Sequence, residues 1–175
     1  MPEPLHPAIV HFPIVLAFLS PIAAAAVLWS IKSGRLSSRA WLHVVILQVA
    51  VMGSGWLAAE AGEDEEERVE RVIAEEYIEE HEEAAERFLA LAGVALALAA
   101  AGMLSHPLGA VARGLTVAAA LASVPLVAAL GHSGGELVYR HGAALAYTQP
   151  DADNALAVRT GTAHDDDDHD DDDDD

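Results

Sequence analysis

Four long apolar segments, separated by short polar stretches, dominate the hydropathy pattern of the chain. They cover residues 8–31, 40–59, 88–104 and 108–130. Most of them are about 20 residues long, which is the length of a helix that crosses the hydrocarbon core of a bilayer. A soluble four-helix bundle is the alternative, but it needs polar residues at about half of the positions in each helix. The run LALAGVALALAAAGML contains none, so the pattern predicts a polytopic membrane protein.

A strongly acidic stretch, residues 60–86, separates the second and third apolar segments. Within it Val69, Val72, Ile73 and Tyr77 recur at helical spacing, which predicts a surface helix that runs into the third segment. We therefore expect an all-α fold, an integral membrane four-helix bundle with an acidic helical extension outside the membrane.

The bundle is predicted to occupy residues 1–147, with helices over about 8–31, 40–60, 69–104 and 108–131. Beyond it, residues 148–175 lose all periodicity and end in ten Asp and one His. Such charge density prevents the burial of a core, so this part of the chain is predicted to be a disordered acidic tail.

The positions of the basic residues predict the orientation of the chain in the membrane. Lys32, Arg35 and Arg39 stand between the first two segments, and Arg113 lies near the turn between the last two. The positive-inside rule places these on the cytoplasmic side, which predicts a multi-pass protein of the cytoplasmic membrane with both termini outside. The start MPEPLHPAIVHFP lacks a positively charged region, so the first segment is predicted to be a retained helix and not a cleaved signal peptide.

Composition and motifs exclude several functions. The net charge is −19 and the chain has no basic face, so no nucleic-acid partner is expected. Without cysteine there is no disulfide and no thiolate ligand. Motifs of the HExxH, G-x-S-x-G and P-loop types are missing, which argues against a hydrolase. Whether the protein is an enzyme at all stays open.

Histidines are the candidate cofactor-binding or metal-binding residues of the chain. Five of them are predicted to meet at the outer face, where three helices begin or end, while His43 and His106 lie on the opposite face. Prolines flank the first two of the five and glycines flank the fourth, and glycine permits either a close backbone approach or unusual dihedral angles. The predicted cofactor-binding or metal-binding residues are His6, His11, His81, His132 and His141.

Imidazole binds haem iron in helix bundles and also suits Zn, Cu and Ni. We therefore expect a b-type haem protein, with one or two haems, that transfers electrons. His11 is favoured as an axial ligand, together with His132 or His81. One alternative is a membrane protein that binds or transports Zn, Cu or Ni through the same cluster. Another is a structural subunit in which the histidines only satisfy helix ends. Expected partners are the lipid bilayer, a quinone or another respiratory-chain component, and further copies of the chain.

Two motifs also carry a resemblance to a known family. At HPAIVHFPI, residues 6–14, and GHSGGELVYRHG, residues 131–142, the chain resembles domain-of-unknown-function family 2231, a group of bacterial and archaeal membrane proteins. The resemblance covers about residues 5–142 and implies four helices. Some members are fused to iron–sulfur or rubredoxin-like domains, or are encoded near respiratory genes, which implies redox work at the membrane. The long Glu-rich helix and the Asp tail depart from the family's pattern. The signature positions implied here are His6, Pro7, His11, Pro13, His81, His132, Gly134, Gly135, Tyr139 and His141.

Overall fold

The computed structural model describes residues 5–105 and 107–147, so the predicted tail over 148–175 and His106 lie outside the described part of the chain. The described residues confirm the predicted all-α fold. The elements, in chain order, are α1 (His6–Ile9), α2 (His11–Lys32), η1 (Ser38–Trp41), α3 (Leu42–Val69), α4 (Glu75–Ala101), α5 (Pro107–Tyr139) and η2 (Ala143–Tyr147).

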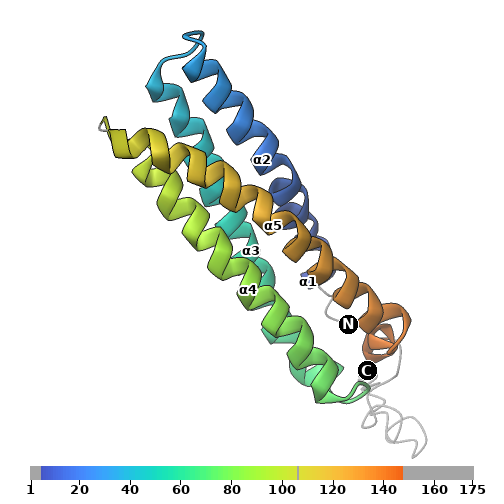
Figure 1. Cartoon of the computed structure of the whole chain (residues 1–175). Coiled ribbons are helices and arrows are strands. Elements are labelled where there is room, and N and C mark those ends of the chain that lie inside the picture. Colours follow the sequence, from blue (N-terminus) through green and yellow to red (C-terminus); the bar gives the residue numbers. More distant parts are fainter. Residues whose placement is uncertain (1–4, 106, 148–175) are drawn as a thin grey trace, which may run out of the picture.

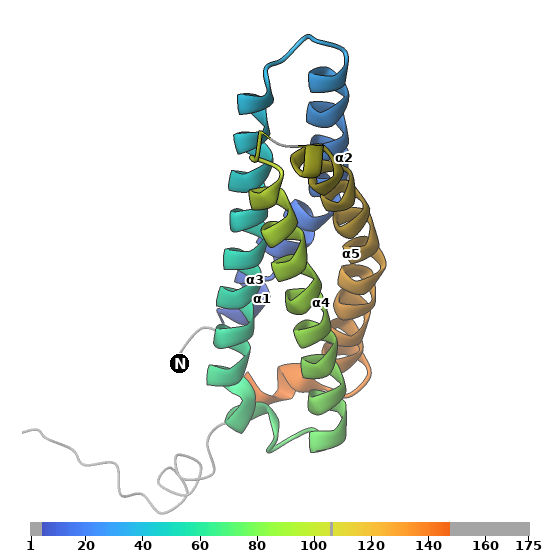
Figure 2. The same cartoon turned by 60° about the vertical axis from the view of Figure 1, so that its left-hand side comes forward.

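The four long helices form an up-and-down bundle (Figure 1). Each packs against its neighbours in the chain, and α5 closes the ring by packing against α2. Of the short elements, η2 lies near the turn between α3 and α4, whereas α1 packs against α3 further from that turn (Figure 2). This turn and the helix ends beside it hold the acidic stretch, so we call it the acidic end of the bundle. The loop with Lys32, Arg35 and Arg39 lies at the other end, the basic end.

The distribution of side chains is that of a protein in lipid. All four long helices are long enough and apolar enough to cross a membrane. Their buried faces are lined mainly by small residues, which let helices approach closely, and Ala17, Ala24 and Ala99 are completely buried. Large apolar side chains point outward instead, among them Phe12 and Ile22, which are 66% and 69% exposed. A surface of this kind is stable against hydrocarbon, and the chain is a multi-pass membrane protein.

Two buried hydrogen bonds to main-chain carbonyls hold the helix ends together at the basic end of the bundle. The indole Nε1 of Trp41 donates to the carbonyl of Ala99 at 3.0 Å, and Nε of Arg113 donates to the carbonyl of Gly102 at 2.7 Å. Carbonyl groups at a helix C-terminus lack partners within their helix. These two side chains therefore satisfy the end of α4 and tie it to η1 and α5.

The first membrane helix is interrupted once. We expected a helix over 8–31, and the structure has a turn of helix, α1, that is separated from α2 at Val10. Backbone angles at Val10 are still helical, with φ −57° and ψ −24°. Pro13 has no N–H and cannot donate to the carbonyl of Ile9, which accounts for the interruption.

The acidic stretch is divided between two helices. The prediction of one helix over 69–104 is wrong at its start, because α3 continues through the first part of the stretch and the chain reverses direction before α4. Ala74 has extended backbone angles, φ −69° and ψ 135°, immediately before α4 begins. No Gly or Pro stands in this turn, so the sequence carries no stop signal there. Instead Ile73 packs with Ile78 and Ala143 in an apolar cluster that closes the end of the bundle.

The last helix extends further than predicted. We expected it to end at 131, but α5 continues to Tyr139 and includes Gly131, Gly134 and Gly135. Glycine within a helix costs about 1 kcal/mol relative to alanine, which is why the sequence pattern favoured a loop. The helix is followed by Gly142, which has φ 83°, a conformation that glycine adopts without strain.

Candidate functional site

Two of the five predicted ligands, His6 and His81, lie side by side at the acidic end. Their ring centroids are 6.2 Å apart and their planes are inclined at 77°, an edge-to-face arrangement. His6 comes from α1 and His81 from the second turn of α4, and both side chains are half-buried. The fold therefore brings together two imidazoles from elements that are far apart in the sequence.

The His6 ring is oriented by α3. Its Nδ1 lies 2.7 Å from the carbonyl oxygen of Ala58. A carbonyl can only accept a hydrogen bond, so Nδ1 carries the hydrogen and donates it. In the neutral ring Nε2 then keeps its lone pair. Gly62 allows this approach, because a Cβ atom at that position would lie 3.1 Å from Nδ1 of His6.

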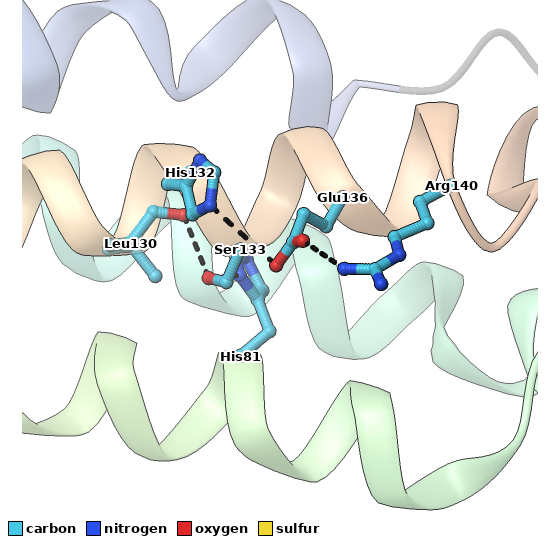
Figure 3. Close-up of polar contacts among 6 residues, drawn as sticks. All are labelled: His81, Leu130, His132, Ser133, Glu136 and Arg140. Atoms are coloured by element: carbon cyan, nitrogen blue, oxygen red, sulfur yellow. Dashed lines mark hydrogen bonds and ion pairs between the residues drawn. The ribbon is translucent and has the colours of Figure 1, made fainter.

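The His81 ring is oriented in the same way by α5 (Figure 3). Its Nδ1 lies 2.8 Å from Oγ of Ser133, and that hydroxyl donates its own hydrogen to the carbonyl of Leu130 at 3.0 Å. With the single hydrogen of the hydroxyl directed to Leu130, Oγ accepts from His81 and Nδ1 is the donor; with that hydrogen directed to His81, the roles are reversed. Gly134 gives the ring its space, since a Cβ atom there would lie 3.1 Å from Cε1 of His81.

The other three predicted ligands lie apart from this pair. His141 stacks on Tyr77, with ring centroids 3.9 Å apart. The His132 side chain is 78% exposed and its Nε2 lies 3.8 Å from a carboxylate oxygen of Glu136. His11 is also exposed. Within the described residues no ring contact joins His11 to His132 or to His81, and the pairing of His11 with one of them stays a prediction.

An open groove of about 440 Å³ runs along α5 beside His132. Glu136 lies in it and accepts a hydrogen bond from Nη1 of Arg140 at 2.8 Å, and His132, Glu136 and Arg140 follow one another at intervals of one helical turn (Figure 3). The groove is lined by Gly131, His132, Gly135, Glu136, Tyr139 and Arg140.

A carboxylate from α3 joins both ends of the described chain at this site. Oε1 of Glu65 accepts hydrogen bonds from the backbone N–H groups of Leu5, at 2.7 Å, and His6, at 3.2 Å, while Oε2 accepts one from the hydroxyl of Tyr147 at 2.5 Å. The guanidinium of Arg68 lies 5.7 Å from the centre of the Tyr147 ring. Burial, together with the hydrogen bond to Glu65, raises the pKa of the Tyr147 phenol, so the hydroxyl keeps its proton and donates it.

Sequence reasoning missed three residues of this site. Ser133 stands inside the glycine-rich motif, and its position between His132 and Gly134 could have marked it. Gly62 is the one glycine in the acidic stretch of residues 60–86, which is an unusual place for a residue of low helix propensity. Nothing in the sequence distinguishes Glu65 from the acidic residues around it.

The donor set is small. No group of three or more His, Asp or Glu side chains in the described residues is arranged to hold a metal ion. What the described part of the chain offers is a pair of imidazoles, each oriented by a hydrogen bond at Nδ1. A pair of this kind can serve as the two axial ligands of a haem, whereas a closed zinc site needs four ligands.

Comparison with known proteins agrees with the predicted membrane-helix pattern and with the family that the sequence resembles. No curated protein and no solved structure matches the chain. A family model described as "Predicted membrane protein (DUF2231)" matches residues 2–146. This match covers the four long helices and the five histidines singled out from the sequence, and the chain therefore belongs to the DUF2231 family of predicted membrane proteins.

Proposed function

We propose that this protein is a membrane haem protein of the b-cytochrome type that transfers electrons, with His6 and His81 as the axial ligands. The observation that carries the proposal is the hydrogen bonding of the two rings. In this proposal both Nδ1 atoms donate, to Ala58 and Ser133, and both Nε2 atoms are left to coordinate. Histidine ligands usually donate their second N–H in this way, which fixes the ring and raises its basicity.

The His6 and His81 rings lie close together although they come from different elements, α1 and α4. Their centroids are 6.2 Å apart. In this proposal the two imidazoles would hold the haem, and the haem would supply the redox chemistry.

The surrounding residues would hold the rings and not the iron. Ala58 and Ser133 fix the tautomers, and Gly62 and Gly134 let α3 and α5 approach the imidazoles closely. A bound haem would take up and release one electron at a time. In this proposal the electrons pass between a membrane quinone and an acceptor outside the membrane.

A transition-metal site is the weaker alternative. Zn, Cu and Ni sites in proteins usually take three or four side-chain ligands. The described residues supply two imidazoles at the site and no third His, Asp or Glu in position. A haem needs two axial ligands, and this pair of imidazoles supplies that number.

The orientation belongs to the same proposal. The acidic end, with the His6–His81 pair and both ends of the described chain, is placed outside the cytoplasmic membrane. The basic end, with Lys32, Arg35 and Arg39, faces the cytoplasm, as the positive-inside rule requires. Protease added to intact spheroplasts is then expected to cut the chain after Tyr147. Protection until lysis would contradict this orientation.

An absorption spectrum of the full-length protein, produced with haem available and purified in detergent, tests the function. We expect a Soret band that sharpens on reduction and a positive pyridine haemochrome assay. His6→Ala and His81→Ala should abolish or shift the band. His43→Ala, at the basic end, is the matched control and should leave it unchanged. A wild-type protein that binds no haem, or a band that survives His81→Ala but not His43→Ala, would refute the proposal.

A further inference from the structure

The element that carries His6 is the first turn of a longer helical run. α1 has four residues and continues into α2 through Val10, whose backbone angles are helical. The first N–H groups of any helix lack partners within it, and the side chain of Leu5 does not cap those of α1. Acceptors for the amides at this end must therefore come from other elements.

Those contacts come from one face of α3. Ala58, Gly62 and Glu65 follow one another at intervals of four and three residues, which places them on the same side of a helix. Ala58 offers its carbonyl to the His6 ring, and Gly62 leaves room for the ring. Glu65 caps α1 by accepting from the amides of Leu5 and His6.

The second oxygen of the Glu65 carboxylate is engaged as well. It accepts the hydrogen bond from the Tyr147 hydroxyl, in η2. With three donors on two oxygens, the side chain of Glu65 is held in one rotamer between the beginning and the end of the described chain. Its neighbour Glu67 is different, because that side chain is 92% exposed.

We propose that Glu65 is the positioning residue for His6, and that it acts by capping α1 while Tyr147 holds its carboxylate in place. Its consequence for cofactor binding rests on the proposed function. In this proposal Glu65 acts through the backbone amides of Leu5 and His6. It does not itself contact the imidazole ring of His6 or a group bound between His6 and His81. Its contribution is to keep Nε2 of His6 at the distance from His81 that the pair requires.

Hydrogen–deuterium exchange of the full-length protein in detergent tests the positioning directly. In Glu65→Ala the amides of Leu5 and His6 should exchange about tenfold faster, because they lose their acceptor. Glu65→Gln keeps a carbonyl oxygen and should stay close to wild type. Glu67→Ala is the matched control. Unchanged exchange at Leu5 and His6 in Glu65→Ala would overturn the proposal.

Haem titration supplies the second readout. Glu65→Ala should weaken haem binding by about tenfold, and Glu65→Gln should restore most of the affinity. In a His6→Ala background, with His81 as the remaining ligand, Glu65→Ala should have no further effect. An equal loss of affinity with and without His6 would show that Glu65 has only a general structural role.

The two measurements separate this inference from the proposed function. If the wild-type protein binds no haem, the proposed function fails, while the exchange rates still decide whether Glu65 holds α1. If Glu65→Ala does not accumulate in membranes, Tyr147→Phe is the alternative variant. It removes the hydroxyl that donates to Glu65 and so tests the same set of hydrogen bonds. It should raise exchange at Leu5 and His6 severalfold, and wild-type rates in that variant would count against the proposal.

Discussion

Replacing Gly134 by alanine should push α5 and the His81 imidazole apart. A Cβ atom at Gly134 would lie 3.1 Å from Cε1 of His81, 3.7 Å from Nδ1 and 3.8 Å from Nε2. The first of these distances is tighter than ordinary van der Waals contact. His81 has little freedom to yield, because Ser133 holds its Nδ1 at 2.8 Å and the ring of His6 lies on its edge.

The magnitude follows from two opposing terms. Alanine in place of glycine within a helix stabilises by up to about 1 kcal/mol. Crowding of a packed site costs about 1–3 kcal/mol. Gly135 provides the control, because a Cβ atom there has nothing within 4 Å. Gly135→Ala should therefore gain the helix stabilisation without the cost of crowding. The two variants should therefore differ by about 1–3 kcal/mol in free energy of unfolding, with Gly134→Ala the less stable.

Unfolding in mixed detergent–SDS micelles, followed by far-UV circular dichroism, measures this difference. The comparison is between adjacent residues of one helix, so contributions from depth in the micelle largely cancel. Equal stability of Gly134→Ala and Gly135→Ala would show that the imidazole of His81 moves aside freely. In that case the close approach of α5 does not position the ring, and the reasoning about its fixed orientation loses its basis.

Three further substitutions probe the fold away from the site, each by the same unfolding measurement. Trp41→Phe removes the donor to the buried carbonyl of Ala99 and should cost about 1–3 kcal/mol; no loss would mean that another donor replaces the indole. Gln48→Leu breaks the buried bond to Ser20 at 2.8 Å and should cost about 1 kcal/mol, a typical value between membrane helices. Adding Ser20→Ala to it should then have little further effect, and fully additive losses would contradict that pairing. Gly142→Ala places a side chain at φ 83° and should cost about 1–2 kcal/mol, whereas an unchanged stability would show that the turn adopts other backbone angles.

Hydropathy predicts the bundle well because the physical requirement is simple. A segment of about 20 apolar residues spans a bilayer as a helix, and all four such segments form helices that are long and apolar enough to do so. Helix ends outside the apolar core obey no such requirement. The turn between α3 and α4 contains no Gly or Pro, and it is fixed by the packing of Ile73 and Ile78 against Ala143. That contact is between distant parts of the chain, which a local pattern cannot predict.

The sequence indicates histidine as the residue type of the candidate site, but it does not indicate which histidines lie next to each other. All five histidines singled out from the sequence are at the acidic end of the bundle, as the alternation of helix directions requires. Which of them meet depends on how each helix is rotated about its own axis. His132 and Ser133 are adjacent in the sequence but point in different directions, and it is Ser133 that contacts His81. Glu65 was unpredictable because its partners are about 60 and 82 residues away.

The direction of the hydrogen bonds limits what the pair of imidazoles can do. A chain of groups that conducts protons needs members that both accept and donate. The Nδ1–H of His6 ends at the carbonyl of Ala58, which cannot pass a proton on. In the proposed tautomer the Nδ1–H of His81 leads to the hydroxyl of Ser133, and that hydroxyl in turn ends at the carbonyl of Leu130. Both routes therefore stop at main-chain carbonyls within one or two steps, which argues against a proton relay through the Nδ1 atoms. The other nitrogen of each ring is Nε2, and coordination by this atom is the role that the proposed function assigns to it.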